Sequence, residues 1–271
     1  MLKQRIITAL CLLPVALGGF FLLQGGWFAL FIALIVCVGA WEWAHLAGFA
    51  APAQRIGYAA AVGAALFGLY LLPQLAAGVL LLATLWWLGA IGLVLGYPDS
   101  QRLWRAPAVR LLIGLLILVP AWQGLVLLKH WPQGNSLILA VMVLIWSADI
   151  GAYFTGKRFG RRKLAVQVSP GKSWEGLYGG LAGSLLITLL VGVYRSWEAR
   201  ELLLALLGAA LVVLISVVGV PLENMFKRQA GLKDSSNLLP GHGGVLDRID
   251  SLTAAVPMFA VLLWLHGWGV L

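Results

Sequence analysis

Long stretches of this chain are apolar almost without interruption. Residues 80–88 hold a single polar side chain, that of Thr84, and similar runs recur along the whole sequence. The strands of a membrane β-barrel alternate apolar and polar residues, so continuous runs indicate helices instead. Because about 20 apolar residues cross a bilayer as a helix, we expect an all-α, polytopic integral membrane protein.

The composition excludes most other classes of protein. Of the 271 residues, 61% are hydrophobic and 11% are charged, with a mean hydropathy of +0.94, whereas soluble domains are about half apolar and a quarter charged. Disorder is excluded by the same figures. The net charge is +9, but the bases are scattered over short segments rather than gathered on a soluble face, so nucleic acid is not an expected partner.

The apolar segments predict about nine spans. We expect them at roughly 6–24, 27–46, 57–73, 75–97, 109–128, 136–155, 175–194, 201–222 and 252–270. The first five fall in an N-terminal region, 1–135. The others fall in a C-terminal catalytic region, 136–271, with two polar loops at about 156–174 and 223–250.

The distribution of bases predicts the orientation. With the N-terminus in the cytoplasm, all but three of the nineteen Lys and Arg residues face the cytoplasm, the exceptions being Lys129, Arg195 and Arg200. That asymmetry is the one expected of a correct topology. It places the C-terminus outside and both polar loops on the cytoplasmic face of a bacterial-type inner (plasma) membrane.

Three aspartates mark the second loop as a candidate metal site. Asp247 and Asp250 are spaced i,i+3, so on a helix both would project from one face, and Asp234 offers a third carboxylate. Hard oxygen ligands beside a polyphosphate favour Mg²⁺, as one or two ions, over zinc. The alternative is that these carboxylates only form ion pairs with neighbouring bases such as Lys233 and Arg248.

A glycine-rich turn precedes these last aspartates. Gly241, Gly243 and Gly244 allow positive φ and a close approach of backbone to a ligand, and His242 could orient a phosphate. The free N–H groups of the following helix suit an anion. The alternative is a turn that needs glycine only to re-enter the membrane.

The first loop carries six bases, which either bind phosphates or follow the positive-inside rule and attract anionic lipids. Lys172 and Ser173 invite a P-loop interpretation, but Gln167 stands where that motif requires glycine. Asp149, near the end of the sixth span, is a costly intramembrane carboxylate that indicates a partner or a task. Glu42 is a weaker indication of the same kind, because it lies close to the cytoplasmic interface.

Two further patterns concern packing. The seventh span carries Gly176, Gly179, Gly180 and Gly183, which allow close helix contact either inside the fold or across a homodimer. The thirteen tryptophans, many of them near span ends, are interpreted as interfacial anchors.

The polar segments resemble a known family. The matching residues in the C-terminal segment are Lys227, Arg228, Lys233, Asp234, Pro240, Gly241, His242, Gly243, Gly244, Asp247, Arg248, Ile249 and Asp250. Those in the middle segment are 149–154, Gly156, Lys157, Phe159, Gly160, Lys163, Leu164 and 169–176. Together they are similar to the signature of the phosphatidate cytidylyltransferases (CDP-diacylglycerol synthases). Asn224 stands where that family usually has Ser, and Ile150 where it often has a small hydroxyl residue.

The resemblance implies an activity and a set of roles. CTP and phosphatidic acid would react at the membrane surface, in contact with membrane lipids, to give CDP-diacylglycerol and pyrophosphate with Mg²⁺. Asp234, Asp247 and Asp250 would hold the metal. Phosphate or polar contacts would come from Lys172, Lys227, Arg228, Lys233, Arg248, Ser169 and Ser173, and from the turn Gly241, His242, Gly243 and Gly244.

Two other classes of function are left open by the residues alone. A transporter of phosphorylated anions would carry charged or broken helices at mid-membrane in two related halves, but the charges here cluster at one face. A non-catalytic scaffold with a lipid-binding basic face would not need the aspartates.

Overall fold

The computed structural model describes residues 2–267, and these form nine α-helices joined by short connections. Met1 and residues 268–271 lie outside the described residues, and with them the expected position of the C-terminus. The helices are α1 (Leu2–Leu17), α2 (Gly25–Leu46), α3 (Pro52–Leu71), α4 (Ala76–Leu95), α5 (Pro107–His130), α6 (Gly134–Phe159), α7 (Trp174–Tyr194), α8 (Ala199–Gln229) and α9 (Leu246–Leu265). The shorter elements are the π-helical turn η1 (Gly18–Leu22), the 3₁₀ turns η2 (Pro73–Leu75) and η3 (Asp99–Trp104), and the strands β1 (Lys163–Ala165) and β2 (Ser169–Ser173).

Each expected span corresponds to one helix, and the all-α membrane fold is confirmed. Among residues 2–267, seven helices are long and apolar enough to cross a bilayer: α2, α4 with η2, and α5 to α9. The apolar part of the first helix, Ile6–Leu22, is shorter than this criterion requires, and α3 does not meet it. The count of nine spans therefore stays a prediction.

Both polar loops are shorter than expected, because the helices on either side of them are longer. Helix α6 continues to Phe159, α8 continues to Gln229 and α9 begins at Leu246. Lys227 and Arg228 therefore lie on the last turn of α8, where cations are favoured by the helix dipole. The prediction that they lie in a loop was wrong.

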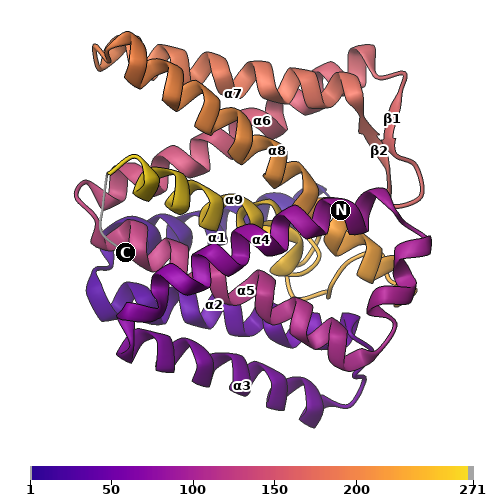
Figure 1. Cartoon of the computed structure of the whole chain (residues 1–271). Helices are drawn as coiled ribbons and strands as arrows, with labels where there is room; N and C mark the ends of the chain where they lie inside the picture. Colours follow the sequence, from indigo (N-terminus) through magenta and orange to yellow (C-terminus); the bar gives the residue numbers. More distant parts are fainter. Residues whose placement is uncertain (1, 268–271) are drawn as a thin grey trace.

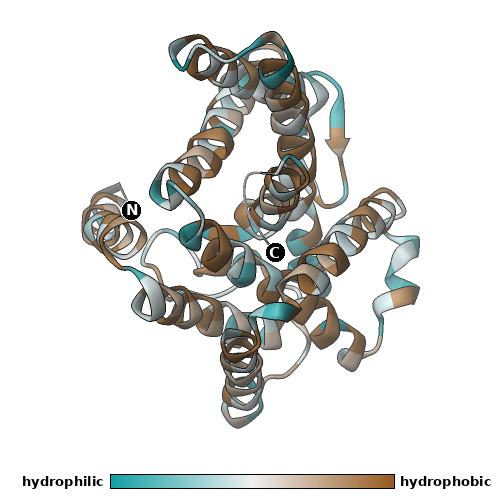
Figure 2. Cartoon of the chain, turned by 60° about the vertical axis from the view of Figure 1, so that its left-hand side comes forward, coloured by the Kyte–Doolittle hydropathy of each residue, from teal (hydrophilic) through white to brown (hydrophobic). Residues whose placement is uncertain are grey.

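The helices lie against one another as a bundle, with the β1–β2 hairpin projecting at one end (Figure 1). Helix α7 packs mainly on α6, whereas α9 packs against α8 and α5. Figure 2 shows apolar residues along the helices and hydrophilic residues mainly at helix ends and in the connections. The hairpin and the segment 230–245, which joins α8 to α9, lie at the same end of the bundle (Figure 1). The two polar segments therefore share one face.

Glycines allow α7 to lie directly on α6. A Cβ on Gly183 would lie 3.0 Å from the carbonyl oxygen of Ser147, and one on Gly180 would lie 2.8 Å from that of Ala148. Real Cβ atoms rarely come so close to backbone. The small residues of the seventh span thus serve a helix contact inside the fold, and a homodimer stays a prediction.

Several tryptophans are core residues rather than interfacial anchors. Trp43, Trp87, Trp104 and Trp122 are all at most 2% exposed, so the anchor prediction is wrong for these four. The ring of Phe226 lies 4.8 Å from that of Trp43 and 4.5 Å from that of Trp104. This aromatic cluster joins α2, η3 and α8 next to the charged end of α8.

Candidate active site

Lys227 is buried between two carboxylates. It is 5% exposed, and its Nζ lies 2.6 Å from Oδ1 of Asp247 and 3.1 Å from Oε1 of Glu223. Glu223 is one turn earlier on α8, and Asp247 is in the first turn of α9. The lysine was predicted to contact phosphate, and the structure instead directs it at two carboxylates. Its charge therefore stabilises the acidic cluster.

Asp247 has hydrogen-bond donors on both oxygens. Besides Lys227 on Oδ1, its Oδ2 accepts hydrogen bonds from the backbone N–H of Ser235 at 2.9 Å, from the Ser235 hydroxyl at 2.9 Å and from the backbone N–H of Gly244 at 2.8 Å. The carboxylate thereby joins α8, the segment 230–245 and α9. Its expected role as a metal ligand stays a prediction, and in the structure Asp247 holds these elements together.

The N-terminus of α9 receives an anion from the protein itself. Glu42, on α2, accepts hydrogen bonds from the backbone N–H of Val245 at 3.0 Å and of Leu246 at 2.7 Å. Its carboxylate is also bound by the hydroxyls of Ser235 and Ser236. These N–H groups were expected to suit an anion, and the anion is a buried glutamate of the chain itself, which occupies the positive end of the helix dipole.

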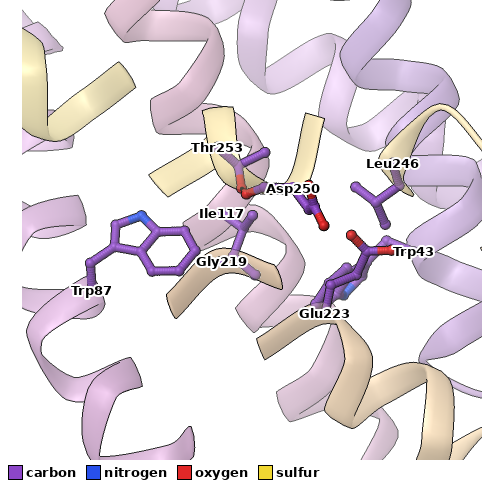
Figure 3. A pocket seen from close by; sticks show the side chains of 8 residues that line it. All are labelled: Trp43, Trp87, Ile117, Gly219, Glu223, Leu246, Asp250 and Thr253. Atoms are coloured by element: carbon purple, nitrogen blue, oxygen red, sulfur yellow. Dashed lines mark hydrogen bonds between the residues drawn. The ribbon is translucent and has the colours of Figure 1, made fainter. Parts of the chain in front are cut away.

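Asp250 and Glu223 form a second, less satisfied acidic pair. Their carboxylates point toward one another across a small cavity of about 10 Å³, which is also lined by Trp43 and Thr253 (Figure 3). Oδ1 of Asp250 accepts a hydrogen bond from the backbone N–H of its neighbour Ser251, at 2.8 Å. Neither oxygen of Glu223 accepts a hydrogen bond from the described residues. Two facing carboxylates repel one another unless a cation or a proton lies between them.

A larger cavity opens beside this pair. It measures about 210 Å³ and lies between α6, α7, α8 and the β hairpin, with Asp149 and Lys172 among its polar lining residues. Burial lowers the pKa of Lys172 from its ordinary value, whereas the nearby carboxylates of Asp250 and Asp149 oppose this shift. Asp149 is exposed toward the cavity rather than buried. Lys172 therefore connects the middle segment with the acidic cluster.

The β hairpin fixes the position of Lys172. The two strands pair antiparallel, with Lys163 opposite Ser173 and Ala165 opposite Ser169. Ser173 is buried and caps α7, because its Oγ accepts the backbone N–H of Gly176 at 3.1 Å. Its geometry explains a structural role as N-cap, and a ligand contact from Ser173 or Ser169 stays a prediction.

The glycine turn brings two of the predicted aspartates together. Gly241 and Gly243 adopt φ values of 76° and 83°, as expected of positions that require glycine. A Cβ on Gly243 would lie 2.7 Å from Oδ2 of Asp247 and 3.4 Å from Cγ of Asp234. Asp234 thus lies beside Asp247, on the exposed side of the turn.

The other bases predicted to bind phosphate lie at the surface rather than inside the buried acidic cluster. Lys233, Arg228 and Arg248 are exposed, and Arg228 donates only a long hydrogen bond, 3.4 Å, to the carbonyl of Leu232. Nδ1 of His242 is buried and lacks a hydrogen-bond partner among the described residues. Exposed bases at the rim of an acidic pocket are available to a polyphosphate.

The described residues contain no group of three or more His, Cys, Asp or Glu side chains that is already arranged around a metal position. The carboxylates that fit Mg²⁺ best are those of Asp250 and Glu223, which face one another. Among the described residues Asp250 accepts a hydrogen bond from Ser251, and Glu223 accepts none, although its Oε1 forms the ion pair with Lys227. Mg²⁺ is commonly bound by one or two carboxylates, with substrate phosphates and water completing its shell.

Sequence reasoning missed Glu223 and Ser235 and left Glu42 without a role. A signal was present for each of the glutamates. Glu223 stands i,i+4 from Lys227 within an apolar helix, and Glu42 lies between Trp41 and Trp43. An ionisable residue in an apolar span indicates a function by default, but its partner is known only from the fold.

The chain is similar to known proteins along almost its whole length. The sequence profile of the "Cytidylyltransferase family" matches residues 3–266. A "Phosphatidate cytidylyltransferase" of Pseudomonas aeruginosa is 69% identical over 269 residues, 99% of this chain and 99% of the relative. Proteins of the same name are 41% identical in Haemophilus influenzae, over 96% of this chain and 98% of the relative, and 32% identical in Rickettsia bellii, over 74% and 89%. This chain therefore belongs to the cytidylyltransferase family.

Proposed function

We propose that this chain is a phosphatidate cytidylyltransferase, which transfers CMP from CTP to phosphatidate and releases pyrophosphate. The observation that carries the proposal is the family match over residues 3–266 together with the position of Lys172. That base comes from the middle segment, yet it lies within electrostatic reach of Asp250 in the C-terminal segment. The two parts of the family signature thus come close together in the fold.

The lipid phosphate is a competent nucleophile without help from a strong base. A phosphate monoester with a second pKa near 6 is largely dianionic at neutral pH. One of its oxygens attacks the α-phosphorus of CTP, and the bond from that phosphorus to the bridging oxygen of the β-phosphate breaks. The protein must hold the two reactants in line and neutralise their charge.

The residues at the cavity suit these two tasks. Lys172 would bind a phosphate at the wall of the cavity, and the exposed bases Lys233, Arg228 and Arg248 would receive the β- and γ-phosphates. Asp250 and Glu223 would hold Mg²⁺, with Asp234 available at the rim. The ion would supply charge neutralisation on the α-phosphoryl group and the leaving pyrophosphate.

The location of the cavity suits a lipid substrate. It is bounded by the apolar helices α6, α7 and α8 and by the polar hairpin, so acyl chains could remain in hydrocarbon while the phosphate meets Lys172. We further propose that this face is cytoplasmic and that the membrane is the bacterial inner membrane, since the bases are concentrated at this end of the bundle.

The proposal is tested with purified protein, CTP radiolabelled at the α-phosphate and phosphatidate in mixed micelles, with and without Mg²⁺. We expect chloroform-soluble label only when lipid and Mg²⁺ are both present. Asp250→Asn should reduce turnover at least about 100-fold, the scale of losing one charge-stabilising group. The matched control is Asp99→Asn, at an exposed aspartate of η3. Absence of lipid product from the wild type, or full activity of Asp250→Asn, would refute the proposal, and uptake of CTP without product would indicate transport.

A further inference from the structure

Glu42 is a buried carboxylate that accepts four hydrogen bonds. Its side chain is 0% exposed. Oε1 accepts hydrogen bonds from the Ser236 hydroxyl at 2.6 Å and from the Val245 N–H at 3.0 Å. Oε2 accepts from the Leu246 N–H at 2.7 Å and from the Ser235 hydroxyl at 3.2 Å. A buried carboxylate is retained at low cost only when its oxygens are bonded in this way.

These four donors bracket the second half of the segment 230–245, which contains the glycine turn. Two are the hydroxyls of Ser235 and Ser236, near its middle, and two are backbone N–H groups at its junction with α9. The carboxylate comes from α2, about 200 residues earlier in the chain, and lies at the N-terminus of α9. One side chain therefore fastens the middle of the segment, directly after Asp234, to its junction with α9, and the glycine turn lies between these two points.

The hydrogen bonds of Glu42 are connected to the acidic cluster through Ser235. The Ser235 hydroxyl lies 3.2 Å from Glu42 Oε2 and 2.9 Å from Asp247 Oδ2, so the two carboxylates share one buried donor. Gly244 is part of the same contact, because a Cβ there would overlap both the Ser235 hydroxyl and the Glu42 carboxylate. Displacement of Glu42 would leave Ser235 bound by Asp247 alone and weaken the support of Asp247.

We propose that Glu42 is a positioning residue for cytidylyl transfer. It touches no reacting atom in this arrangement; it holds the segment 230–245 and the first turn of α9, so that Asp234 and Asp250 keep their places relative to Lys172. The catalytic part of this inference rests on the proposed function. Its structural part, the anchoring of the segment, does not.

The test compares Glu42→Gln with the wild type. A glutamine of the same shape presents an NH₂ group to donors that need an acceptor, and it removes the charge from the helix terminus. We expect kcat to fall about 10- to 100-fold, as for residues that hold catalytic groups in place, while KM for CTP changes less than kcat. Lysyl endopeptidase should also cut faster after the exposed Lys233, which reports release of the segment without any need for activity.

The control is Glu198→Gln. Glu198 also caps a helix, because it is the N-cap of α8 and forms a capping box with Glu201, but it lies at the other end of that helix from Lys227. This variant should leave kcat and cleavage after Lys233 unchanged. Should Glu42→Gln fail to fold, Ser236→Ala removes the 2.6 Å hydrogen bond to Glu42, together with the 3.1 Å bond that the Ser236 hydroxyl accepts from the Leu238 N–H, and should show both effects in smaller measure.

The outcomes separate the two proposals. Faster cleavage after Lys233 with a lower kcat, at a melting temperature close to that of Glu198→Gln, supports the positioning role. Wild-type cleavage and wild-type kcat would overturn it, as would a loss of activity that only follows a loss of folded protein. If the wild type forms no CDP-diacylglycerol, the proposed function fails, and the cleavage rates still decide whether Glu42 anchors the segment.

Discussion

Replacing Lys227 with methionine should destabilise the fold strongly. The ammonium lies 2.6 Å from Asp247 and 3.1 Å from Glu223, and all three side chains are at most 7% exposed. Methionine fills similar space but leaves two buried carboxylates without their cation. Removing one partner of a buried ion pair costs about 3–5 kcal/mol, because the remaining charge is uncompensated. At about 2–4 °C per kcal/mol for a large domain, the melting temperature should fall by about 6–20 °C.

The assay is thermal unfolding in detergent micelles, followed by the helical circular dichroism signal. The matched control is Lys233→Met, which removes an exposed base and should change stability by less than about 0.5 kcal/mol. The double variant Lys227→Met with Glu223→Gln should recover part of the loss, since one uncompensated charge is gone. If the melting temperature of Lys227→Met equals that of Lys233→Met, Lys227 does not neutralise the acidic cluster, and the interpretation of the ion pairs is wrong.

Two further predictions concern the cavity and the turn. Burial lowers the pKa of Lys172, so this lysine loses its proton at a lower pH than an ordinary lysine, and kcat/KM should begin to fall at a lower alkaline pH. Lys172→Arg keeps its charge and should move this alkaline decline to higher pH. Identical pH profiles of the two proteins would exclude a phosphate contact that requires the ammonium. Gly243→Ala places a Cβ 2.7 Å from Asp247 Oδ2 at a φ of 83° and should cost at least about 1–2 kcal/mol together with most of the CDP-diacylglycerol formation. Gly231→Ala, at a φ of 70° with open space around it, carries only the backbone cost, so equal losses in the two variants would show that the contact with Asp247 is unimportant.

The local sequence pattern was enough to predict the membrane fold and to locate the polar segments that carry the site. Continuous apolar runs leave a helix as the only way to satisfy every backbone group within hydrocarbon, so each expected span corresponds to a helix. The glycines at 241 and 243 were also predictable, because a left-handed backbone conformation restricts the residue locally. The ends of α6, α8 and α9 were misplaced because charged residues were taken to end a helix, although Lys227 and Asp247 remain helical by pairing with each other.

The partners of the charged residues were decided by the tertiary structure alone. The sequence by itself determined that the chain crosses a membrane, which residues carry charge and which glycines permit a turn. It did not determine that Glu42 meets the N-terminus of α9, that Lys227 lies between Glu223 and Asp247, or that Lys172 approaches Asp250. Each of these interactions joins elements that are adjacent only after the bundle has packed. In a low-dielectric interior the nearest opposite charge, wherever it lies in the sequence, decides what a buried charge does.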